Sequence, residues 1–340
     1  MIIFATETSC DETSVCILNK EKKILSHIIH TQKEHGKFGG VVPEIASRSH
    51  LQILQKITKQ AFYESNINIK DVNLFCSTSG PGLMGGLLVG TTFTKSLAIG
   101  CGKPYMPINH LEGHILSPTF NNIINYPYIC FLLTGGHTQL YLIRDINKYE
   151  MLGETLDDAI GEAFDKVAKL LGQSYPGGPI IEKKAKKGDD KYFDLPHPLN
   201  KKNNLNFSFS GIKTAVNLIV KKNNNIDEKF INNMSASFQK KISDILENKL
   251  HSVMIYLEQE KIKVSQISIV GGVASNKNIF YRMEKKAKDY NCSVILPPDF
   301  MFSDNAAMIA WVAMNKYTKK FNSDLLSKPN PRLSIDSIKL

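Results

Sequence analysis

One arrangement occurs twice in the sequence and limits the folds that the chain can adopt. An apolar strand, a small polar turn and a returning strand are written first as "MIIFATETS" and "TSVCILN", and again as "YPYICFLLTGGHTQLYLIRD". The two hairpins lie near residues 4–16 and 130–142, and segments with helical periodicity follow each of them. Each hairpin is the start of a region in which strands and helices alternate. Two such regions predict an α/β protein of two similar domains, with parallel and antiparallel strands in each sheet.

Length and composition agree with two domains and suggest an anionic partner. A chain of 340 residues exceeds an average domain, and 42% hydrophobic with 22% charged residues is ordinary for a globular protein with a large core. The 42 basic and 32 acidic residues leave a net charge of +10, which favours nucleic acid or an anionic membrane as a partner. Much of this excess lies in Lys/Asn-rich segments such as "KKNNNIDEK", for which a solvated surface is an equally good interpretation.

The cysteines and the N-terminus indicate a cellular compartment. The six cysteines are scattered without a C-x-x-C pair, so neither a zinc knuckle nor a redox pair is indicated, and reduced, buried thiols are expected. The N-terminus lacks the basic start and apolar run of a signal peptide, and no apolar run reaches the length of a membrane span. These features predict a cytoplasmic protein without a membrane partner.

Three turns rich in glycine and small polar residues are candidates for binding phosphate. They are "ETSCDETS" (7–14), "TGGHTQ" (134–139) and "VGGVASN" (270–276), and each follows an apolar strand. Glycine allows positive φ and close approach, so N–H groups in such turns can surround phosphate oxygens. For any one of them a plain tight turn is the better interpretation, whereas three in matched strand contexts favour a nucleotide site.

A histidine pair in "NHLEGHILSP" suggests a metal site. His110 and His114 are four residues apart, so on a helix they share one face and could bind the same ion. A third ligand is needed, and Asp304 in "MFSDNAAM" is the best candidate, although Ser303 or Asp304 could instead cap the last helix. Two histidines and a carboxylate would suit iron, zinc or manganese and leave coordination positions open. A histidine pair without any metal is the alternative.

The same motif is close to the H-E-x-x-H helix of zinc proteases. In that helix the glutamate directly follows the first histidine and acts as the base. Glu112 lies one position later and would point elsewhere on a helix, which disfavours a metalloprotease. We therefore expect Glu112 to take no part in the chemistry.

Other charged residues have functional and plainer interpretations. Asp11 and Glu12, in the first turn, could be a base and a metal or water partner, or solvated turn residues. Asp165 is by default a solvated helix carboxylate. Lys213 and the lysines of 183–187 could bind a phosphate backbone, but helix-surface lysines usually do not. The polar segment 186–206 could be a nucleic-acid lip, although a solvated insertion is favoured.

Eight motifs, in order along the chain, resemble those of one family. They are "ETSCDET", "NHLEGH", "LLTGGHTQL", "GEAFDKVAKLLG", "YPGGP", "FSFSGIKTA", "VGGVASN" and "FSDNAAMIA". Together they resemble the bacterial form of the universal tRNA N6-adenosine threonylcarbamoyltransferase family, once called O-sialoglycoprotein endopeptidase. The resemblance extends from about residue 2 to about residue 335, with no missing block.

The resemblance implies a fold and a set of site residues. The fold is the two-domain actin/Hsp70/sugar-kinase-like (ASKHA) fold, with residues 1–108 and about 305–340 in one domain and 109–304 in the other. One divalent metal per subunit, Fe²⁺ or alternatively Zn²⁺, is implied on the His110, His114 and Asp304 set named above. A site for threonylcarbamoyl-adenylate is implied by Leu132, Leu133, Thr134, Gly135, Gly136, Asp165, Gly178, Glu182 and Asn276.

The resemblance also implies a reaction and partners. The threonylcarbamoyl group moves to N6 of adenosine 37 in tRNAs that read codons beginning with A, and AMP is released. Asp11 is the carboxylate expected to accept the amine proton, with Glu12 as the second choice. The implied partners are tRNA, a smaller inactive paralogue in a heterodimer, and a P-loop ATPase, while a separate enzyme makes the adenylate.

Two other functions are alternatives to the transferase. A small-molecule kinase or ATPase of the same fold class remains open, because a fold does not settle a function. A non-catalytic tRNA-binding subunit is the other, and the retained His, His and Asp set argues against it.

Overall fold

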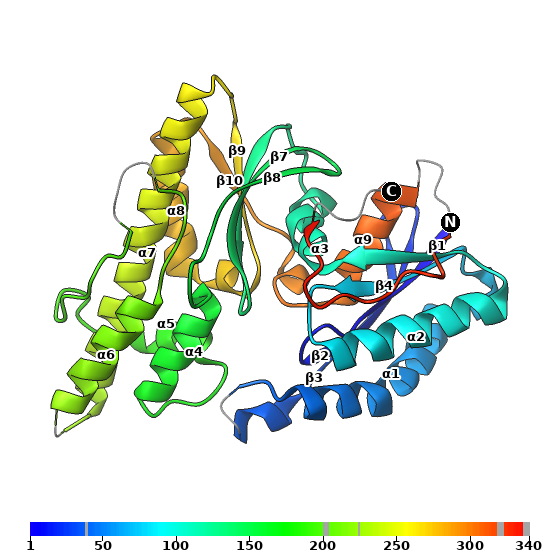
Figure 1. Cartoon of the computed structure of the whole chain (residues 1–340), viewed down its shortest axis with the longest axis horizontal. Coiled ribbons are helices and arrows are strands. Elements are labelled where there is room, and N and C mark those ends of the chain that lie inside the picture. The colour runs from blue at the N-terminus through cyan, green and yellow to red at the C-terminus, as the bar shows by residue number, and fades with distance from the viewer. Residues whose placement is uncertain (38–39, 200–203, 224, 318–322, 336–340) are drawn as a thin grey trace. The chain divides into compact units, whose positions relative to one another are not determined.

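The chain forms two compact units, residues 1–121 with 298–340 and residues 122–297. Part of the polar segment 186–206, for which a nucleic-acid lip or a solvated insertion was predicted, lies outside the residues described. The computed structural model, shown in Figure 1, describes residues 1–37, 40–199, 204–223, 225–317 and 323–335.

The first unit is a five-stranded sheet with helices on both faces. The strand order is β3-β2-β1-β4-β5, with antiparallel pairing from β3 to β1 and parallel pairing from β1 to β5. Helices α1 and α2 cover one face, and α9 with α3 beside it lies on the other (Figure 1). The elements are β1 (Ile2–Glu7), β2 (Glu12–Asn19), β3 (Ile24–Thr31), η1 (Lys33–Lys37), α1 (Pro43–Ser65), η2 (Ile69–Asp71), β4 (Leu74–Gly80), α2 (Met84–Cys101), β5 (Tyr105–Asn109), α3 (His110–Leu116), η3 (Ser117–Phe120), η5 (Asp299–Met301) and α9 (Ala306–Tyr317).

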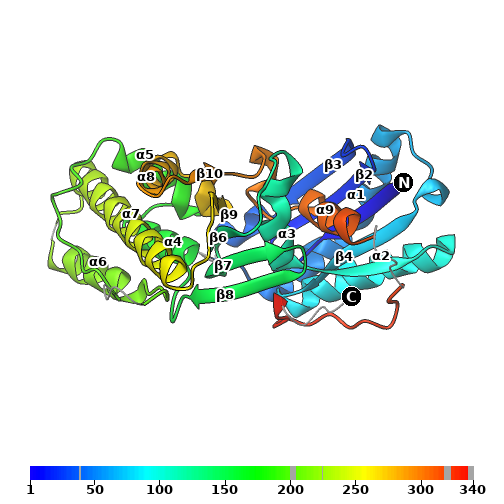
Figure 2. The same cartoon turned by 90° about the horizontal axis from the view of Figure 1, so that it is seen from above.

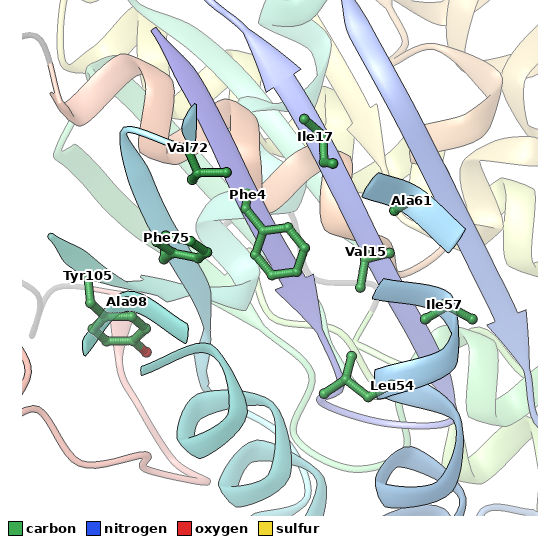
Figure 3. Packing of buried hydrophobic residues seen from close by; sticks show 10 residues of the cluster. All are labelled: Phe4, Val15, Ile17, Leu54, Ile57, Ala61, Val72, Phe75, Ala98 and Tyr105. Atoms are coloured by element: carbon green, nitrogen blue, oxygen red, sulfur yellow. The ribbon is translucent and has the colours of Figure 1, made fainter. Parts of the chain in front are cut away.

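The core on the α1 and α2 side follows from the two periodicities of strand and helix. Side chains alternate along a strand, so Phe4 of β1 and Val15 of β2 point to the same face (Figure 3). Phe4 stacks on Phe62 of α1 with ring centroids 5.4 Å apart. Helix α1 presents apolar residues at a spacing of three and four, which places them on one stripe against the sheet. The cluster in Figure 3 comprises Phe4, Val15, Ile17, Leu54, Ile57, Ala61, Val72, Phe75, Ala98 and Tyr105.

The second unit is a five-stranded sheet with its helices to one side, as both views show (Figures 1 and 2). The strand order is β10-β9-β6-β7-β8, with β6–β7 and β7–β8 antiparallel and β6–β9 and β9–β10 parallel. The long helix α7 packs on α5 and α8. The elements are β6 (Tyr128–Leu133), β7 (Thr138–Asp145), β8 (Lys148–Glu154), α4 (Ile160–Leu170), α5 (Gly177–Ala185), α6 (Ser210–Lys222), α7 (Glu228–Gln259), β9 (Gln266–Val270), η4 (Gly272–Ser275), α8 (Lys277–Lys288) and β10 (Ser293–Ile295).

The two sheets have the same topology, as the repeated hairpin predicted. Each begins with a three-stranded antiparallel meander, β1–β3 or β6–β8, and two parallel strands extend it from the first strand of the meander. The prediction of two similar α/β halves with mixed sheets is therefore confirmed. Helices α1, α6 and α7 lie among the segments with helical periodicity that follow the two hairpins.

The boundaries between the units differ from the predicted ones. The first unit runs to Asn121 and resumes at Pro298, whereas the sequence predicted changes after residues 108 and 304. The physical reason is the packing of α3 on α9 and on the end of β5, since all three belong to the first unit. Asp304 and the two histidines consequently lie in one unit.

The last part of the chain that the structure describes returns to the strands of the first unit. Residues 323–335 lie along β4 and β5 and form main-chain hydrogen bonds with both. The side-chain amide of Asn109, at the end of β5, donates to the carbonyl oxygens of Leu333 and Ser334, at 3.3 Å each. The segment therefore holds the residue that precedes α3.

The sequence predicts reduced, buried cysteines and no apolar run of membrane-spanning length. The six cysteines are free thiols, and burial raises the pKa of Cys130 to about 12. Among the residues described, no helix combines the length and the apolar character that crossing a membrane requires.

Lys249 is a buried lysine of α7 that is held by carbonyl groups. The residue is 3% exposed, and its Nζ donates to Leu199 O at 3.0 Å and to Asn204 O at 2.7 Å. Burial lowers the pKa of Lys249 to about 8, because a charged ammonium loses hydration in the interior.

This lowered pKa predicts a pH dependence of stability. Between about pH 8 and its ordinary value of 10.5, the unfolded chain retains the Lys249 proton and the folded chain has released it, so stability rises with pH. The free energy of unfolding of the native chain should therefore rise, relative to Lys249→Met, from about pH 7.5 to about pH 10. Urea unfolding at both pH values measures it. Lys263→Met, an exposed control, should follow the native chain, and identical pH profiles for native and Lys249→Met would contradict the prediction.

Candidate functional site

The histidine pair lies on α3, a short helix whose start is fixed by its cap. The side-chain oxygen of Asn109 accepts hydrogen bonds from Leu111 N at 2.9 Å and Glu112 N at 3.3 Å. This N-cap satisfies two of the amides that lack a partner at a helix start. His110 and His114, at positions i and i+4, consequently share a face of the helix.

The structure brings Asp304 to both histidines. Asp304 Oδ1 lies 3.0 Å from His114 Nε2 and 3.5 Å from His110 Nε2. One ligand atom from each of the three residues lies within 4.8 Å of the others. Two imidazole nitrogens and one carboxylate oxygen at these separations are a donor set that could close around a single ion.

A buried carboxylate that the sequence did not single out orients the first histidine. Glu7 Oε2 lies 3.2 Å from His110 Nδ1, and Ser9 Oγ lies at the same distance. Glu7 is itself held by hydrogen bonds from Ser9 N at 2.6 Å and from the Thr78 hydroxyl. A hydrogen bond at Nδ1 leaves Nε2 facing Asp304, which is how outer-shell carboxylates fix a histidine for a metal.

The electrostatics of this cluster favour a positive charge at its centre. Burial lowers the pKa of His110, but Asp304 and Glu7 outweigh it and raise that pKa well above the ordinary value. Burial raises the pKa of Asp304, and the attraction of His110 and His114 outweighs it and leaves the pKa well below its usual range. In addition, Nδ1 of His114 is buried without a hydrogen-bond partner among the described residues. A divalent cation would supply the charge that the two carboxylates attract, so these residues fit a metal.

The predicted alternative role of Asp304 as a helix cap is wrong. Helix α9 begins at Ala306, and its cap is Asn305, whose Oδ1 accepts from Met308 N at 3.0 Å. The amide of Ala306, the first residue of the helix, donates to the hydroxyl oxygen of Ser14 at 3.0 Å. Because other residues serve the helix start, the Asp304 carboxylate remains directed at the histidines.

Glu112 points away from this donor set into an ion pair. Its Oε2 lies 2.5 Å from Lys316 Nζ of α9, and both side chains are 2% exposed. A carboxylate paired in this way does not act as the base of a zinc protease beside His110 and His114. The geometry therefore adds to the argument against a metalloprotease.

Asp11 and Glu12 belong to the same unit and lie where β1 turns into β2. Asp11 is 8% exposed and is therefore buried, which contradicts its plainer interpretation as a solvated turn residue, whereas Glu12 is half-buried. Burial raises the pKa of Glu12 well above its usual value, and the charges of Asp304 and Asp11 raise it further. Glu12 also shares a side-chain hydrogen bond with Asp11 and feels the charge of Asp304, so these two carboxyl groups lie near the His110, His114 and Asp304 donor set.

The end of β6 and the turn between β6 and β7 contain the first group of predicted substrate-binding residues, Leu132 to Gly136. Thr134 N donates to His137 O at 2.9 Å, and the Thr134 hydroxyl accepts from His137 N at 2.9 Å. Gly135 and Gly136 lie at the tip, with open space where a Cβ would be. Leu132 and Leu133 are fully buried at the end of β6, so the structure exposes neither of them to a ligand.

Two glycines bring other segments against this turn. A Cβ on Gly161, at the start of α4, would lie 2.8 Å from Gly135 Cα. A Cβ on Gly271, which has φ +92°, would lie 2.5 Å from Leu133 O and 2.7 Å from Thr134 Cγ2. The β6–β7 turn, the start of α4 and the turn after β9 are therefore packed together at distances that only glycine allows.

Asp165, Glu182 and Asn276 connect the helices around these turns. Asp165 Oδ1 of α4 accepts from Gly177 N at 2.7 Å, so Asp165 is a structural acceptor and not a freely solvated carboxylate. Glu182 Oε1 of α5 accepts from Lys277 N at 3.1 Å. Asn276 caps α8 and donates to Gln239 Oε1 at 2.8 Å, a contact that the sequence did not suggest.

The structure also places Gly178, Lys184 and Lys213, three further residues of the second unit that the sequence singled out. Gly178, in the first turn of α5, has open space beside it where a side chain would lie. The side chain of Lys213 lies 3.3 Å from Asp158 Oδ2, and Lys184 lies 3.3 Å from Glu228 Oε1. These lysines are therefore engaged in ion pairs within the unit.

Solved structures of other proteins share this architecture. The solved structure of full-length HypF in its phosphate- and nucleotide-bound form is similar over 94% of this chain and 47% of that chain, with a TM-score of 0.62 and 11% identity. The activator of 2-hydroxyisocaproyl-CoA dehydratase from Clostridium difficile, with bound ADPNP, matches over 95% and 99%, with a TM-score of 0.51 and 14% identity. At these identities the likeness shows the fold alone, which is the predicted two-unit α/β fold of the ASKHA class.

Sequence relatives then give the family. The model of the TsaD family, tRNA N6-adenosine threonylcarbamoyltransferase, matches residues 23–311. A relative of that name from Wolbachia pipientis wMel is 45% identical over 335 residues, 98% of this chain and 99% of its own. Another from Rickettsia rickettsii (strain Sheila Smith) is 44% identical over 339 residues, covering 99% and 98%. The chain belongs to the family of tRNA N6-adenosine threonylcarbamoyltransferases, which confirms the predicted resemblance.

Proposed function

We propose that this protein transfers the threonylcarbamoyl group of threonylcarbamoyl-adenylate to N6 of adenosine 37 in tRNAs that read codons beginning with A, and that AMP is released. The observation that carries the proposal is the convergence of His110, His114 and Asp304 in a chain of this family. The turns of the second unit, with their N–H groups and glycines, would bind the adenylate.

The chemistry explains why such a site is needed. The exocyclic amine of adenine is a poor nucleophile, because its lone pair is delocalised into the ring. An activated acyl donor, its orientation and the stabilisation of charge on the carbamoyl oxygen or the leaving phosphate must supply the rate enhancement. His110, His114 and Asp304 would hold one divalent metal, Fe²⁺ or Zn²⁺, which would act as a template and Lewis acid.

The transfer step requires one base, which accepts a proton from the adenosine amine. The N6 nitrogen forms a bond to the carbamoyl carbon, the bond from that carbon to the phosphate oxygen breaks, and AMP leaves with the electron pair. The amine proton goes to Asp11, with Glu12 as the second choice. Glu12 is the second choice because burial and the neighbouring carboxylates raise its pKa well above the usual value, which favours its protonated form.

The proposed function includes tRNA and two proteins as partners and a cytoplasmic location. The net charge of +10 favours tRNA through sequence-independent attraction to phosphate. A smaller inactive paralogue in a heterodimer and a P-loop ATPase are proposed as protein partners, on the strength of the family. Free, largely buried cysteines agree with a reducing cytoplasm.

Reconstitution tests the proposal. The purified protein, its two partner proteins, unmodified tRNA and threonylcarbamoyl-adenylate should yield threonylcarbamoyl-adenosine at position 37 and an equal amount of AMP. Nucleoside analysis of digested tRNA measures the first product and chromatography measures the second. Phosphorylation of a small molecule by the isolated chain, without tRNA modification, would instead favour the kinase alternative.

A further inference from the structure

A buried ion pair joins α3, which carries His110 and His114, to α9, which begins two residues after Asp304. Glu112 of α3 and Lys316 of α9 approach to 2.5 Å, and each side chain is 2% exposed. Removing two charges from water is so unfavourable that such pairs often add little to stability, and apolar replacements are frequently neutral or stabilising. The pair is therefore weak evidence for added stability, whereas fixing one register of two helices is a role that buried polar groups have in some proteins.

The pair lies on the side of α3 opposite to the donor set. Glu112 is two residues from His110 and two from His114, which turns it by about 200° around the helix from each of them. The histidines reach Asp304, directly before α9 begins, while Glu112 reaches Lys316 in the last turn of α9. The two contacts therefore hold α3 near both ends of the partner helix.

A glycine supplies a third contact between them. A Cβ on Gly113 would lie 3.0 Å from Met308 Cγ and 3.2 Å from Ile309 Cδ1, so the absence of a side chain lets α3 approach α9 closely. Helix α3 has only seven residues, and a shift of one residue would rotate its histidines by about 100°. So short a helix needs external contacts to keep both histidines directed at Asp304.

We infer that Glu112 and Lys316 are positioning residues that fix the register of α3 on α9 and thereby hold His110 and His114 at Asp304. The inference rests on the proposed metal centre. It gives Glu112 a part in forming the site, where the sequence predicted none.

Metal affinity, measured apart from activity, tests the inference. Glu112→Leu combined with Lys316→Met removes both charges at similar volume and avoids an uncompensated buried charge. This double variant should bind Zn²⁺ on the order of 10-fold more weakly, in competition with a chromophoric chelator, which is the lower end of the loss on removing an outer support. The metal-free double variant should melt at or above the temperature of the native chain. A melting temperature that falls while Zn²⁺ affinity stays unchanged would overturn the inference.

Two further variants keep the test decisive. The charge-reversed pair, Glu112→Lys with Lys316→Glu, should bind Zn²⁺ more tightly than the neutral pair, and equal or weaker binding would overturn the inference. Glu247→Leu with Arg282→Met removes a half-buried ion pair between α7 and α8 and should leave Zn²⁺ affinity unchanged. If the native chain binds Zn²⁺ no better than His114→Ala, the metal centre itself is wrong and the inference falls with it.

Discussion

Asp304→Ala should lower tRNA modification by more than about 100-fold, because it removes one of the three proposed metal ligands. The loss of an outer-shell partner alone lowers metal affinity or activity by about 10- to 100-fold, and the loss of a ligand should have a larger effect. The carboxylate lies 3.0 Å from His114 Nε2 and 3.5 Å from His110 Nε2, and no other carboxylate of the described residues completes this donor set. Replacing His110 and His114 together by alanine should have an effect at least as large. Nucleoside analysis of tRNA from depleted cells that carry each variant measures the outcome.

The matched control for this prediction lies in the same loop. Asp299→Ala removes an exposed carboxylate five positions earlier, in η5, and should leave modification at the native level. Metal content, measured on the purified proteins, should fall for Asp304→Ala and remain for Asp299→Ala. Normal modification by the double histidine variant would refute the role of the cluster.

Gly271→Ala should destabilise the second unit by about 3 kcal/mol or more and abolish substrate binding, because a Cβ has no room at this position. Gly271 has φ +92°, and its Cβ would lie 2.5 Å from Leu133 O, a main-chain atom that cannot rotate away. Relief of the clash would displace the turn at Thr134, where the adenylate is proposed to bind. Urea unfolding and the binding of a non-hydrolysable adenylate analogue measure the two effects.

The neighbouring glycine provides the comparison. A Cβ on Gly272 would meet nothing within 4 Å, so Gly272→Ala should change the free energy of unfolding by no more than about 0.5 kcal/mol. Equal stability of the two variants would show that the backbone at 271 relaxes more readily than its surroundings suggest.

The repeated hairpins and the helical periodicity were sufficient to predict the two mixed sheets, because strand alternation and the helical repeat are local properties of the sequence. The spacing of His110 and His114 likewise predicted that they share a helix face. Pairing them with Asp304 was a hypothesis, since 190 residues separate Asp304 from His114 and no local rule reports such a contact.

The contacts that sequence reasoning missed are all between distant segments. Glu7 orients His110 across 103 positions, and Lys316 pairs with Glu112 across 204. Neither partner carries a local signature: a buried glutamate at the end of a strand and a lysine near the end of a helix are both ordinary by sequence. The predicted cap of α9 was wrong for a different reason. Ser303, Asp304 and Asn305 are all good capping residues, so the sequence does not show which of them precedes the first turn.

The first unit is built from both ends of the chain, and this has a consequence for biosynthesis. The ribosome makes α3 and the exposed face of the first sheet, then the whole of residues 122–297, and only afterwards Asp304 and α9. At about 5–20 residues per second, the interval between His114 and Asp304 lasts roughly 10 to 40 s. Throughout that interval the apolar surface that α9 will cover is open to the cell, and the proposed metal site cannot yet form.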